Sequence, residues 1–170
     1  TPTPTPTPLN PWAGHWVGMH SDSILFTSGN DEIYIVRTDG SDLIQLTAQV
    51  GENLYPRWSP DGNKIVFVYG PPTGNPYDRD LYIISSNTYT PNNITNSPNM
   101  YFDPLWSPDG SFLMFVKDGD IYRMEPDGSE LIKLAGGGGG APALSPDGNR
   151  IAYRQSGGLY VMNVDGSNRL

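Results

Sequence analysis

The sequence predicts an all-β protein built from repeated four-stranded units, and three observations support this prediction. Glycine and proline together supply 37 of the 170 residues, as 20 plus 17. At this proportion long helices are disfavoured, and short strands joined by tight turns are the default. A five-residue pattern, Trp or Leu followed by Ser-Pro-Asp-Gly, occurs three times along the chain. The segments that follow it are short, apolar and bounded by further turn residues.

Composition also narrows the functional class. With 36% hydrophobic and 16% charged residues, the chain is long enough to bury a full core. It contains no cysteine, which excludes a disulfide framework and thiolate chemistry. A net charge of −8 argues against nucleic acid and anionic membranes as partners. The sequence has neither an apolar run long enough to span a membrane nor a signal stretch at its N-terminus.

Residues 1–12 are expected to be an extended tail. They begin with four Thr-Pro repeats, and proline fixes φ and keeps the preceding residue extended. One interpretation is a linker. The other is a docking strand, because the N–H donors of Thr1, Thr3, Thr5 and Thr7 lie along one edge and can pair with an open sheet edge. We favour docking onto a neighbouring subunit over docking within one chain. Such a head-to-tail contact would build a filament.

Residues 13–170 are expected to form four repeated units of about 40 residues, at about 13–47, 53–95, 101–135 and 141–170. Three of them contain Ser-Pro-Asp-Gly, preceded by Trp58, Trp106 or Leu144. All four contain an aliphatic-Tyr pair. The tyrosines of these pairs are Tyr34, Tyr82, Tyr122 and Tyr160. The first, third and fourth units also carry Asp-Gly-Ser, beginning at Asp39, Asp127 and Asp165.

Each unit is expected to contain four strands in chain order. The first ends at the Trp58 position, and Ser-Pro-Asp-Gly then turns the chain, because proline presets φ and glycine accepts a positive φ. The second strand carries an aromatic residue, which is Phe26, Phe67, Phe115 or Tyr153. The third strand is apolar on both faces, and the fourth closes the unit. A sheet with two apolar faces must be covered on both, as a blade is between two other blades.

This pattern resembles the repeat of TolB-type β-propellers, relatives of WD-repeat proteins that also occur as the propeller part of prolyl-oligopeptidase-like enzymes. The string is Pro-x-Trp-Ser-Pro-Asp-Gly, an apolar strand, an aliphatic-Tyr pair, Asp-Gly-Ser and Leu-Thr, and it extends over roughly Trp16 to Leu170. The resemblance implies a β-propeller fold and, for function, only an interaction platform. Such propellers usually have more than the four units present here.

No catalytic motif or cofactor site is found in the sequence. It contains no G-x-S-x-G elbow, no H-E-x-x-H pair and no phosphate loop. Its two histidines, His15 and His20, lack the clustered carboxylates of a metal site. The aspartates of the Asp-Gly turns are interpreted as structural, because Asp side chains bond to their own turn backbone. We therefore expect no enzyme, no cofactor and no metal.

The second unit carries a long loop, Gly70 to Asp80, which is the best candidate for recognition. In a propeller this loop shares a face with the connections between units, here 47–55, 95–103 and 135–141. Tyr77, Asp78 and Arg79 are the expected contact residues, although a plain surface insertion is the alternative. For sugars, Asn93 is in an N-glycosylation acceptor sequence. The threonines beside proline at positions 1, 3, 5 and 7 suit O-glycosylation.

The sequence therefore predicts a non-catalytic bacterial propeller, extracellular or at the cell surface, with the periplasm as the alternative location. Its expected role is structural or in protein-protein interaction, and copies of itself are the expected partner, in a homo-oligomer or filament. Two alternatives stay open. One is a fragment of a larger protein, such as the propeller domain of a prolyl-oligopeptidase-like enzyme. The other is a site for a small ligand or an ion in a central channel.

Overall fold

Every regular element in the described part of the protein is a β-strand. The computed structural model describes residues 20–73, 75, 77–97, 99–137 and 140–170. Residues 1–12, expected to form the tail, and 13–19, assigned to the first unit, lie outside the described residues. The strands are β1 Ser23–Thr27, β2 Ile33–Arg37, β3 Ile44–Gln45, β4 Glu52–Trp58, β5 Lys64–Gly70, β6 Asp80–Ser85, β7 Asn92–Asn93, β8 Tyr101–Trp106, β9 Leu113–Lys117, β10 Asp120–Met124, β11 Ile132–Ala135, β12 Gly140–Leu144, β13 Arg150–Gln155 and β14 Gly158–Asn163.

The strands form four antiparallel sheets in chain order, which we call blades 1 to 4. Blade 1 is β1-β2-β3, blade 2 is β4 to β7, blade 3 is β8 to β11 and blade 4 is β12-β13-β14. The predicted first strands end where expected, at Trp58, Trp106 and Leu144. In blade 4, Leu170 and Val161 exchange backbone hydrogen bonds of 2.8 and 3.0 Å, which begins a fourth strand. The all-β propeller blades predicted from the sequence are confirmed, although blades 1 and 4 each contain three of the four expected strands among the described residues.

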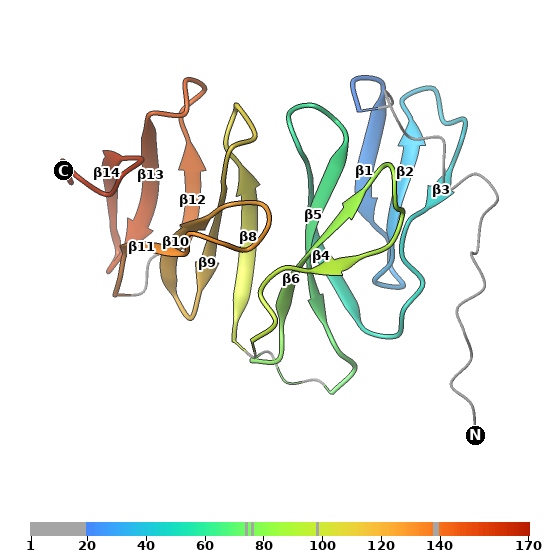
Figure 1. Cartoon of the computed structure of the whole chain (residues 1–170), viewed down its shortest axis with the longest axis horizontal. Coiled ribbons are helices and arrows are strands. Elements are labelled where there is room, and N and C mark those ends of the chain that lie inside the picture. Colours follow the sequence, from blue (N-terminus) through green and yellow to red (C-terminus); the bar gives the residue numbers. More distant parts are fainter. Residues whose placement is uncertain (1–19, 74, 76, 98, 138–139) are drawn as a thin grey trace.

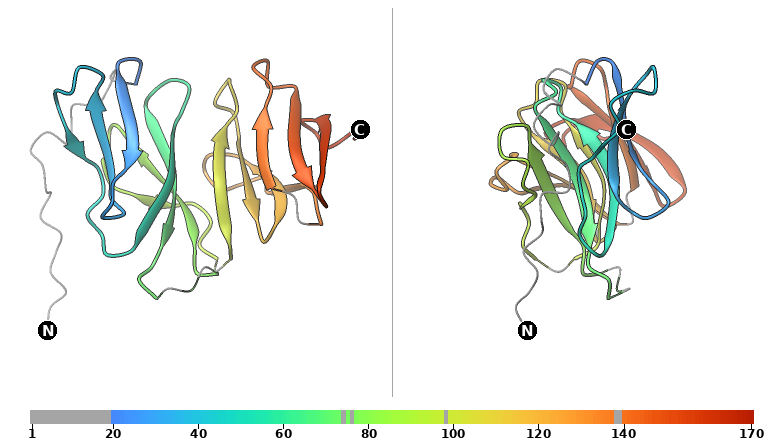
Figure 2. Two further views of the ribbon diagram at one scale, coloured as in Figure 1. Left: turned by 180° about the vertical axis from the view of Figure 1, so that it is seen from behind. Right: turned by 90° about the vertical axis from the view of Figure 1, so that its right-hand side faces the viewer.

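The blades follow one another in an open row (Figure 1). Figure 2 shows blade 1 and blade 4 at opposite ends of the molecule. Strands of blade 1 contact only blade 2, and strands of blade 4 contact only blade 3, among the described residues. Each end blade therefore has one side that no other described blade covers.

The aromatic residues of the second and third strands pair in one register in all four blades. The directly opposed pairs are Phe26 with Tyr34, Phe67 with Tyr82, Phe115 with Tyr122 and Tyr153 with Tyr160. Their ring centroids lie 5.7 to 6.2 Å apart, within the range of favourable aromatic contact. This register confirms the alignment of the four units predicted from the sequence.

A separate hydrophobic core fills each of the three joints between neighbouring blades. The core of blades 2 and 3, for example, joins Val68 and Leu81 of blade 2 to Leu113 and Phe115 of blade 3. At each joint, the later blade contributes the side that carries its opposed aromatic pair, and the earlier blade contributes an aliphatic side. The same arrangement recurs in the other two cores. The stacking of blades is therefore directional, because every joint packs an aliphatic side of one blade against an aromatic side of the next.

The tyrosines of the four aliphatic-Tyr pairs are less buried than most of the second-strand aromatic residues that they oppose. Phe67, Phe115 and Tyr153 are fully buried, but Tyr34, Tyr82, Tyr122 and Tyr160 are half-buried. At the rim of a joint a phenol hydroxyl can reach a polar partner or water, whereas the hydroxyl of buried Tyr153 has no hydrogen-bond partner among the described residues. The Tyr82 hydroxyl accepts a hydrogen bond from Asn93 Nδ2 at 3.3 Å. The tyrosines therefore form the polar edge of each joint, and the second-strand aromatics form its centre.

Candidate protein-interaction face

The long β5-β6 connection lies beside a connection between blades, as predicted. The Arg79 N–H donates to the Asn99 carbonyl at 3.1 Å, and the Ser97 N–H donates to Asp80 Oδ1 at 3.0 Å. The β3-β4 connection meets the base of the same loop, because the Tyr69 hydroxyl donates to the Val50 carbonyl at 2.9 Å. We call the surface formed by the described residues of 46–51, 71–80 and 94–100 the loop face.

An ion pair between two strand ends holds the long loop to blade 2. Arg79 Nη2 lies 2.6 Å from Glu52 Oε2, and the Arg79 side chain is only 16% exposed. The fit is close, because a Cβ added at Gly70 would lie 3.3 Å from Arg79 Cγ. Arg79, expected from the sequence to contact a partner, is therefore placed where it fixes the base of the loop.

Tyr77 is the large side chain that the long loop presents to solvent. It is 58% exposed. Its backbone N–H donates to Asn75 Oδ1 and the Asp78 N–H donates to the Asn75 carbonyl, both at 3.1 Å. Asp78 also accepts a long hydrogen bond from the Thr73 hydroxyl, at 3.4 Å. The tip of the loop is thus braced by its own hydrogen bonds while the Tyr77 ring stays accessible.

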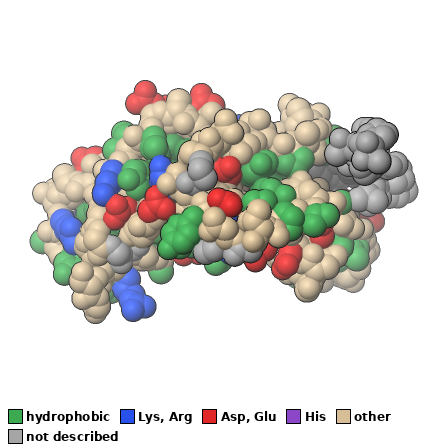
Figure 3. Space-filling view, turned by 90° about the horizontal axis from the view of Figure 1, so that it is seen from below, with side chains coloured by type: hydrophobic (Ala, Val, Ile, Leu, Met, Phe, Trp, Pro, Cys, Tyr) green, Lys and Arg blue, Asp and Glu red, His purple; other side chains and the backbone are tan. Residues whose placement is uncertain are grey.

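The same face of the molecule presents further apolar and acidic groups. Val50 is 77% exposed. Figure 3 views the molecule from this side and shows hydrophobic and acidic side chains interspersed over its surface. Exposed aromatic and apolar side chains interspersed with charged ones occur at protein contact surfaces.

A threonine and an acidic residue join strand ends beneath the loop face in blades 1 and 2. Thr95 Oγ1 donates to Asp80 Oδ1 at 2.6 Å and accepts the Leu81 N–H at 3.0 Å. In blade 1, Thr47 makes the corresponding contacts with Glu32 and Ile33. Burial raises the pKa of Glu32, and the Thr47 hydrogen bond partly offsets that rise. These hydrogen bonds attach the outer strand of blades 1 and 2 to the strand beside it and hold the structure beneath the loop face in place.

Asn93 belongs to the same network. Its side-chain Nδ2 donates to Asp80 Oδ2 at 3.0 Å and to the Tyr82 hydroxyl. Its Oδ1 accepts the N–H groups of Thr95 and Asn96, at 3.0 and 2.9 Å. Nδ2, the atom that would carry an N-linked sugar, thus already donates hydrogen bonds within blade 2. The tail threonines at positions 1, 3, 5 and 7 lie outside the described residues.

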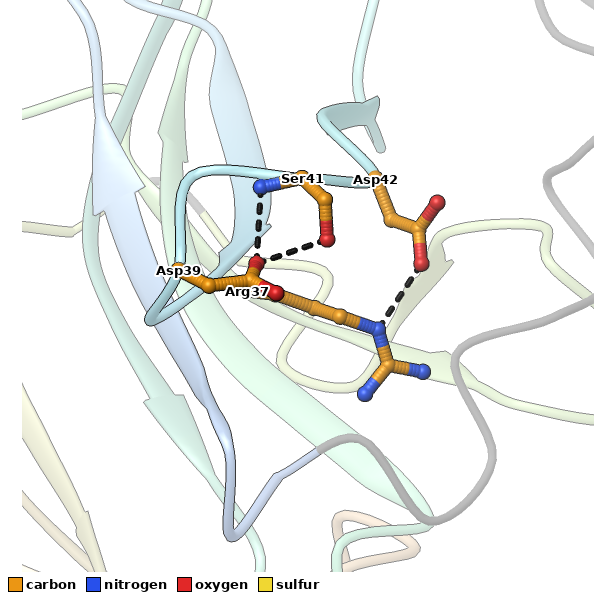
Figure 4. Close-up of polar contacts among 4 residues, drawn as sticks. All are labelled: Arg37, Asp39, Ser41 and Asp42. Atoms are coloured by element: carbon orange, nitrogen blue, oxygen red, sulfur yellow. Dashed lines mark hydrogen bonds and ion pairs between the residues drawn. The ribbon is translucent and has the colours of Figure 1, made fainter.

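The predicted turns form the opposite face of the molecule, and we call this surface the turn face. In each Ser-Pro-Asp-Gly turn, the serine hydroxyl donates to the aspartate and accepts a backbone N–H. Ser107 Oγ does so with Asp109 at 2.6 Å and Phe112 at 3.0 Å. In the Asp-Gly-Ser turn of blade 1, Asp39 accepts from the backbone and hydroxyl of Ser41 (Figure 4). The structural role predicted for these aspartates is confirmed.

The turn aspartates are strong hydrogen-bond acceptors, and this lowers their pKa values. Hydrogen bonds from Ser107 and Ser111 lower the pKa of Asp109 to about 2. Ser145 and Asn149 do the same for Asp147, whose pKa is also about 2. Each carboxylate is thus occupied by its own turn and does not form part of a shared acid-base pair.

The described residues contain no cluster of three or more His, Cys, Asp or Glu side chains that could hold a metal ion. The His20 ring lies edge-on to Trp58, with centroids 6.2 Å apart. A shallow pocket of about 390 Å³ on the turn face of blade 3 is lined by Ser111, Phe112, Arg123, Met124, Glu125, Ser129, Glu130 and Ile132. No helix within the described ranges is long and apolar enough to cross a membrane.

Comparison with known proteins identifies the repeat. The model of the TolB beta propeller domain family matches residues 24–169. TolB from Acinetobacter baumannii is similar at 22% identity and a TM-score of 0.74, over 88% of this chain and 40% of that one. A putative TolB from Agrobacterium tumefaciens is similar at 21% identity and a TM-score of 0.69, over 87% of this chain and 59% of that one.

A propeller from an enzyme is also similar. A puromycin-hydrolyzing peptidase from Mycobacterium tuberculosis matches at 19% identity and a TM-score of 0.68, over 88% of this chain and 30% of that one. At these identities the likeness shows the fold. The chain spans less than two thirds of the length of each of these structures. None of the curated proteins compared matches it in sequence.

Proposed function

This chain belongs to the TolB beta-propeller domain family, and from that premise we propose that it is a non-catalytic module that binds a protein partner through the loop face. One observation carries the proposal: the Tyr77 ring is 58% exposed on a loop whose base is held by the Arg79–Glu52 ion pair. A loop whose base is already fixed loses less conformational entropy on binding, and aromatic side chains dominate contact energies.

The test places a photo-crosslinking phenylalanine analogue at position 77, with Leu131 as the matched control site. Leu131 is 50% exposed, near the turn of the β10-β11 hairpin and away from the loop face. We expect a protein crosslinked from position 77 and not from position 131. Tyr77→Ala should then weaken binding of that identified protein at least about tenfold without changing thermal stability. Equal crosslinking from both sites, or unchanged affinity of Tyr77→Ala, would contradict the proposal.

A second candidate is the propeller domain of a larger enzyme. It is favoured by the similarity to the peptidase, of which this chain matches 30%. In that arrangement the loop face would contact another domain of the same polypeptide. An intact mass of the native protein well above the 18.6 kDa of this chain would support it. The extracellular or periplasmic location, the tail-mediated filament and the glycosylation remain predictions.

A further inference from the structure

The two ends of the row expose residues that are buried at every internal joint. The aliphatic residue before the third-strand tyrosine is Ile33, Leu81, Ile121 or Leu159 in blades 1 to 4. The first three are 0% exposed, packed in the joints with the next blade, whereas Leu159 is 76% exposed. The aliphatic side of blade 4 therefore carries the joint leucine at this position with no described blade against it, and Arg154 opposes Leu159 where Val68 and Val116 oppose Leu81 and Ile121.

Blade 1 shows the complementary exposure on its aromatic side. The residue two before the second-strand aromatic is Ile24, Ile65, Leu113 or Ile151 in blades 1 to 4. The last three are 0% exposed, packed against the preceding blade, whereas Ile24 is 52% exposed. Phe26 is half-buried, although Phe67, Phe115 and Tyr153 at its position are fully buried. Blade 1 thus presents the other half of a joint.

We infer that the occupant of both sides is a second copy of this chain, and that two copies close head to tail into an eight-bladed ring. Blade 4 of each copy would pack its aliphatic side on the aromatic side of blade 1 of the other. The two contacts are then related by a two-fold axis, which makes the assembly closed and symmetric. A ring of about eight blades lies within the usual size of propellers.

Internal packing and charge both support this pairing. At the joint of blades 3 and 4, Ile121 packs with Ile151 and Tyr153, and Leu159 would meet Ile24 and Phe26 of the second copy in the same way. The strand period of two places Arg150 and Arg154 on the outer side of blade 4, where both are exposed. Exposed Asp22 immediately precedes β1, so an acidic residue lies at the start of the strand that carries Ile24. Its charge is opposite to that of Arg150 and Arg154.

The experiment measures the mass of the 170-residue chain in solution by light scattering across a concentration series. We expect about twice the 18.6 kDa of one chain. Leu159→Asp and Ile24→Asp should each weaken the dimer at least about tenfold, because each puts a charge into a joint. Val50→Asp is the matched control, since Val50 is 77% exposed on the loop face and takes no part in either joint. It should leave the dimer unchanged.

Mixing the two variants tests the direction of the contact. Leu159→Asp retains an intact blade 1 side, and Ile24→Asp retains an intact blade 4 side. An equimolar mixture should therefore re-form one of the two contacts and recover a species of two chains that neither variant forms alone. Circular dichroism and thermal melting confirm that each variant is folded. Leu159→Ser provides a milder change at the same site.

Three results would overturn the inference. The first is a chain that stays at 18.6 kDa throughout the series, which would mean that the end blades take another occupant, such as further blades of a longer protein. The second is an assembly that neither variant weakens. The third is an assembly larger than two chains, which would exclude the closed ring. None of these results depends on the loop face, so the proposed function stands or falls separately.

Discussion

At the scale of single residues, one carboxylate oxygen organises each Ser-Pro-Asp-Gly turn. Asp109 Oδ1 accepts from the Ser107 hydroxyl, the Ser111 N–H and the Ser111 hydroxyl, at 2.6 to 3.0 Å. The serine in turn accepts the Phe112 N–H that begins the next strand. Only the ionised carboxylate is free to accept all of these bonds at full strength, so the turn is coupled to pH.

We predict that the protein loses stability in acid through these turns. The pKa of about 2 for Asp109 and Asp147 lies below the ordinary value of 3.8, so the folded state favours the ionised form. That contribution is fully present above the ordinary pKa and is lost as the pH falls from about 4 to about 2. Urea midpoints across this range should fall in the wild type and fall less in the Asp109→Asn/Asp147→Asn double variant. Identical slopes for the two proteins would refute the turn mechanism.

Turn residues were predictable because their interactions span only a few positions. Asp39, Asp61 and Asp109 bond within their own turns, as their sequence neighbours indicate. Contacts between distant elements were not. The Arg79–Glu52 ion pair joins residues 27 positions apart, and Arg79 was expected to contact a partner. No local sequence pattern predicts such an ion pair, because its geometry depends on how the ends of two strands come together in the fold.

At the scale of elements, the Asp-Gly-Ser turns of blades 3 and 4 pack on the blade before them. A Cβ added at Gly128 would lie 2.3 Å from the Ile94 carbonyl oxygen at the outer strand of blade 2. At the equivalent Gly40 of blade 1, nothing lies within 4 Å. Both glycines have positive φ, +90° and +85°. The two positions therefore differ in the contact between blades and not in local backbone conformation.

This pair gives a matched test of the contact between blades. Gly40→Ala should cost about 1–2 kcal/mol of unfolding free energy, the cost of placing a Cβ at positive φ. Gly128→Ala should cost about 1–3 kcal/mol more, because the methyl group also forces blades 2 and 3 apart. Urea unfolding of the two variants measures the difference. Equal losses would mean that the Asp-Gly-Ser turn of blade 3 yields without disturbing its neighbour.

The register of the strands was predictable, and the depth of burial was not. Phe115 and Tyr122 oppose each other as their spacing indicates, since a strand period of two fixes which residues share a side. Whether a ring on that side is buried depends on the blade stacked against it and on the polar groups at the rim. Tyr82 and Tyr122 are half-buried for this reason.

At the scale of the whole molecule, stability should vary along the row of blades. Blades 2 and 3 are packed on both sides, whereas blades 1 and 4 each have one side without a described neighbour. In repeat proteins the stability of a unit is approximately the sum of its own stability and that of its joints with neighbours. The end blades of a single copy should therefore open more readily than the middle ones.

Amide hydrogen exchange of the Leu159→Asp variant, measured on single copies, tests this gradient. We expect the slowest exchange in β5 and β9, the second strands of blades 2 and 3, and faster exchange in β1 and β13. In the wild type, formation of the ring should slow exchange in β1 and β13 specifically. Uniform protection across all four blades of a single copy would contradict a row held together joint by joint.

The stacked Ser-Pro-Asp-Gly turns have a consequence for how such a chain can change in length. Pro108 lies against the position of a Cβ on Gly148, at 3.2 Å, and Pro60 lies near that of Gly110, at 3.7 Å. The turn of blade 3 thus contacts the previous blade through Gly110 and the next blade through Pro108. A duplicated gene segment that encodes one such unit would also encode the turn residues that contact the neighbouring blades. Insertion or loss of a whole unit would then preserve every remaining contact, and the number of blades could evolve without redesign of any blade.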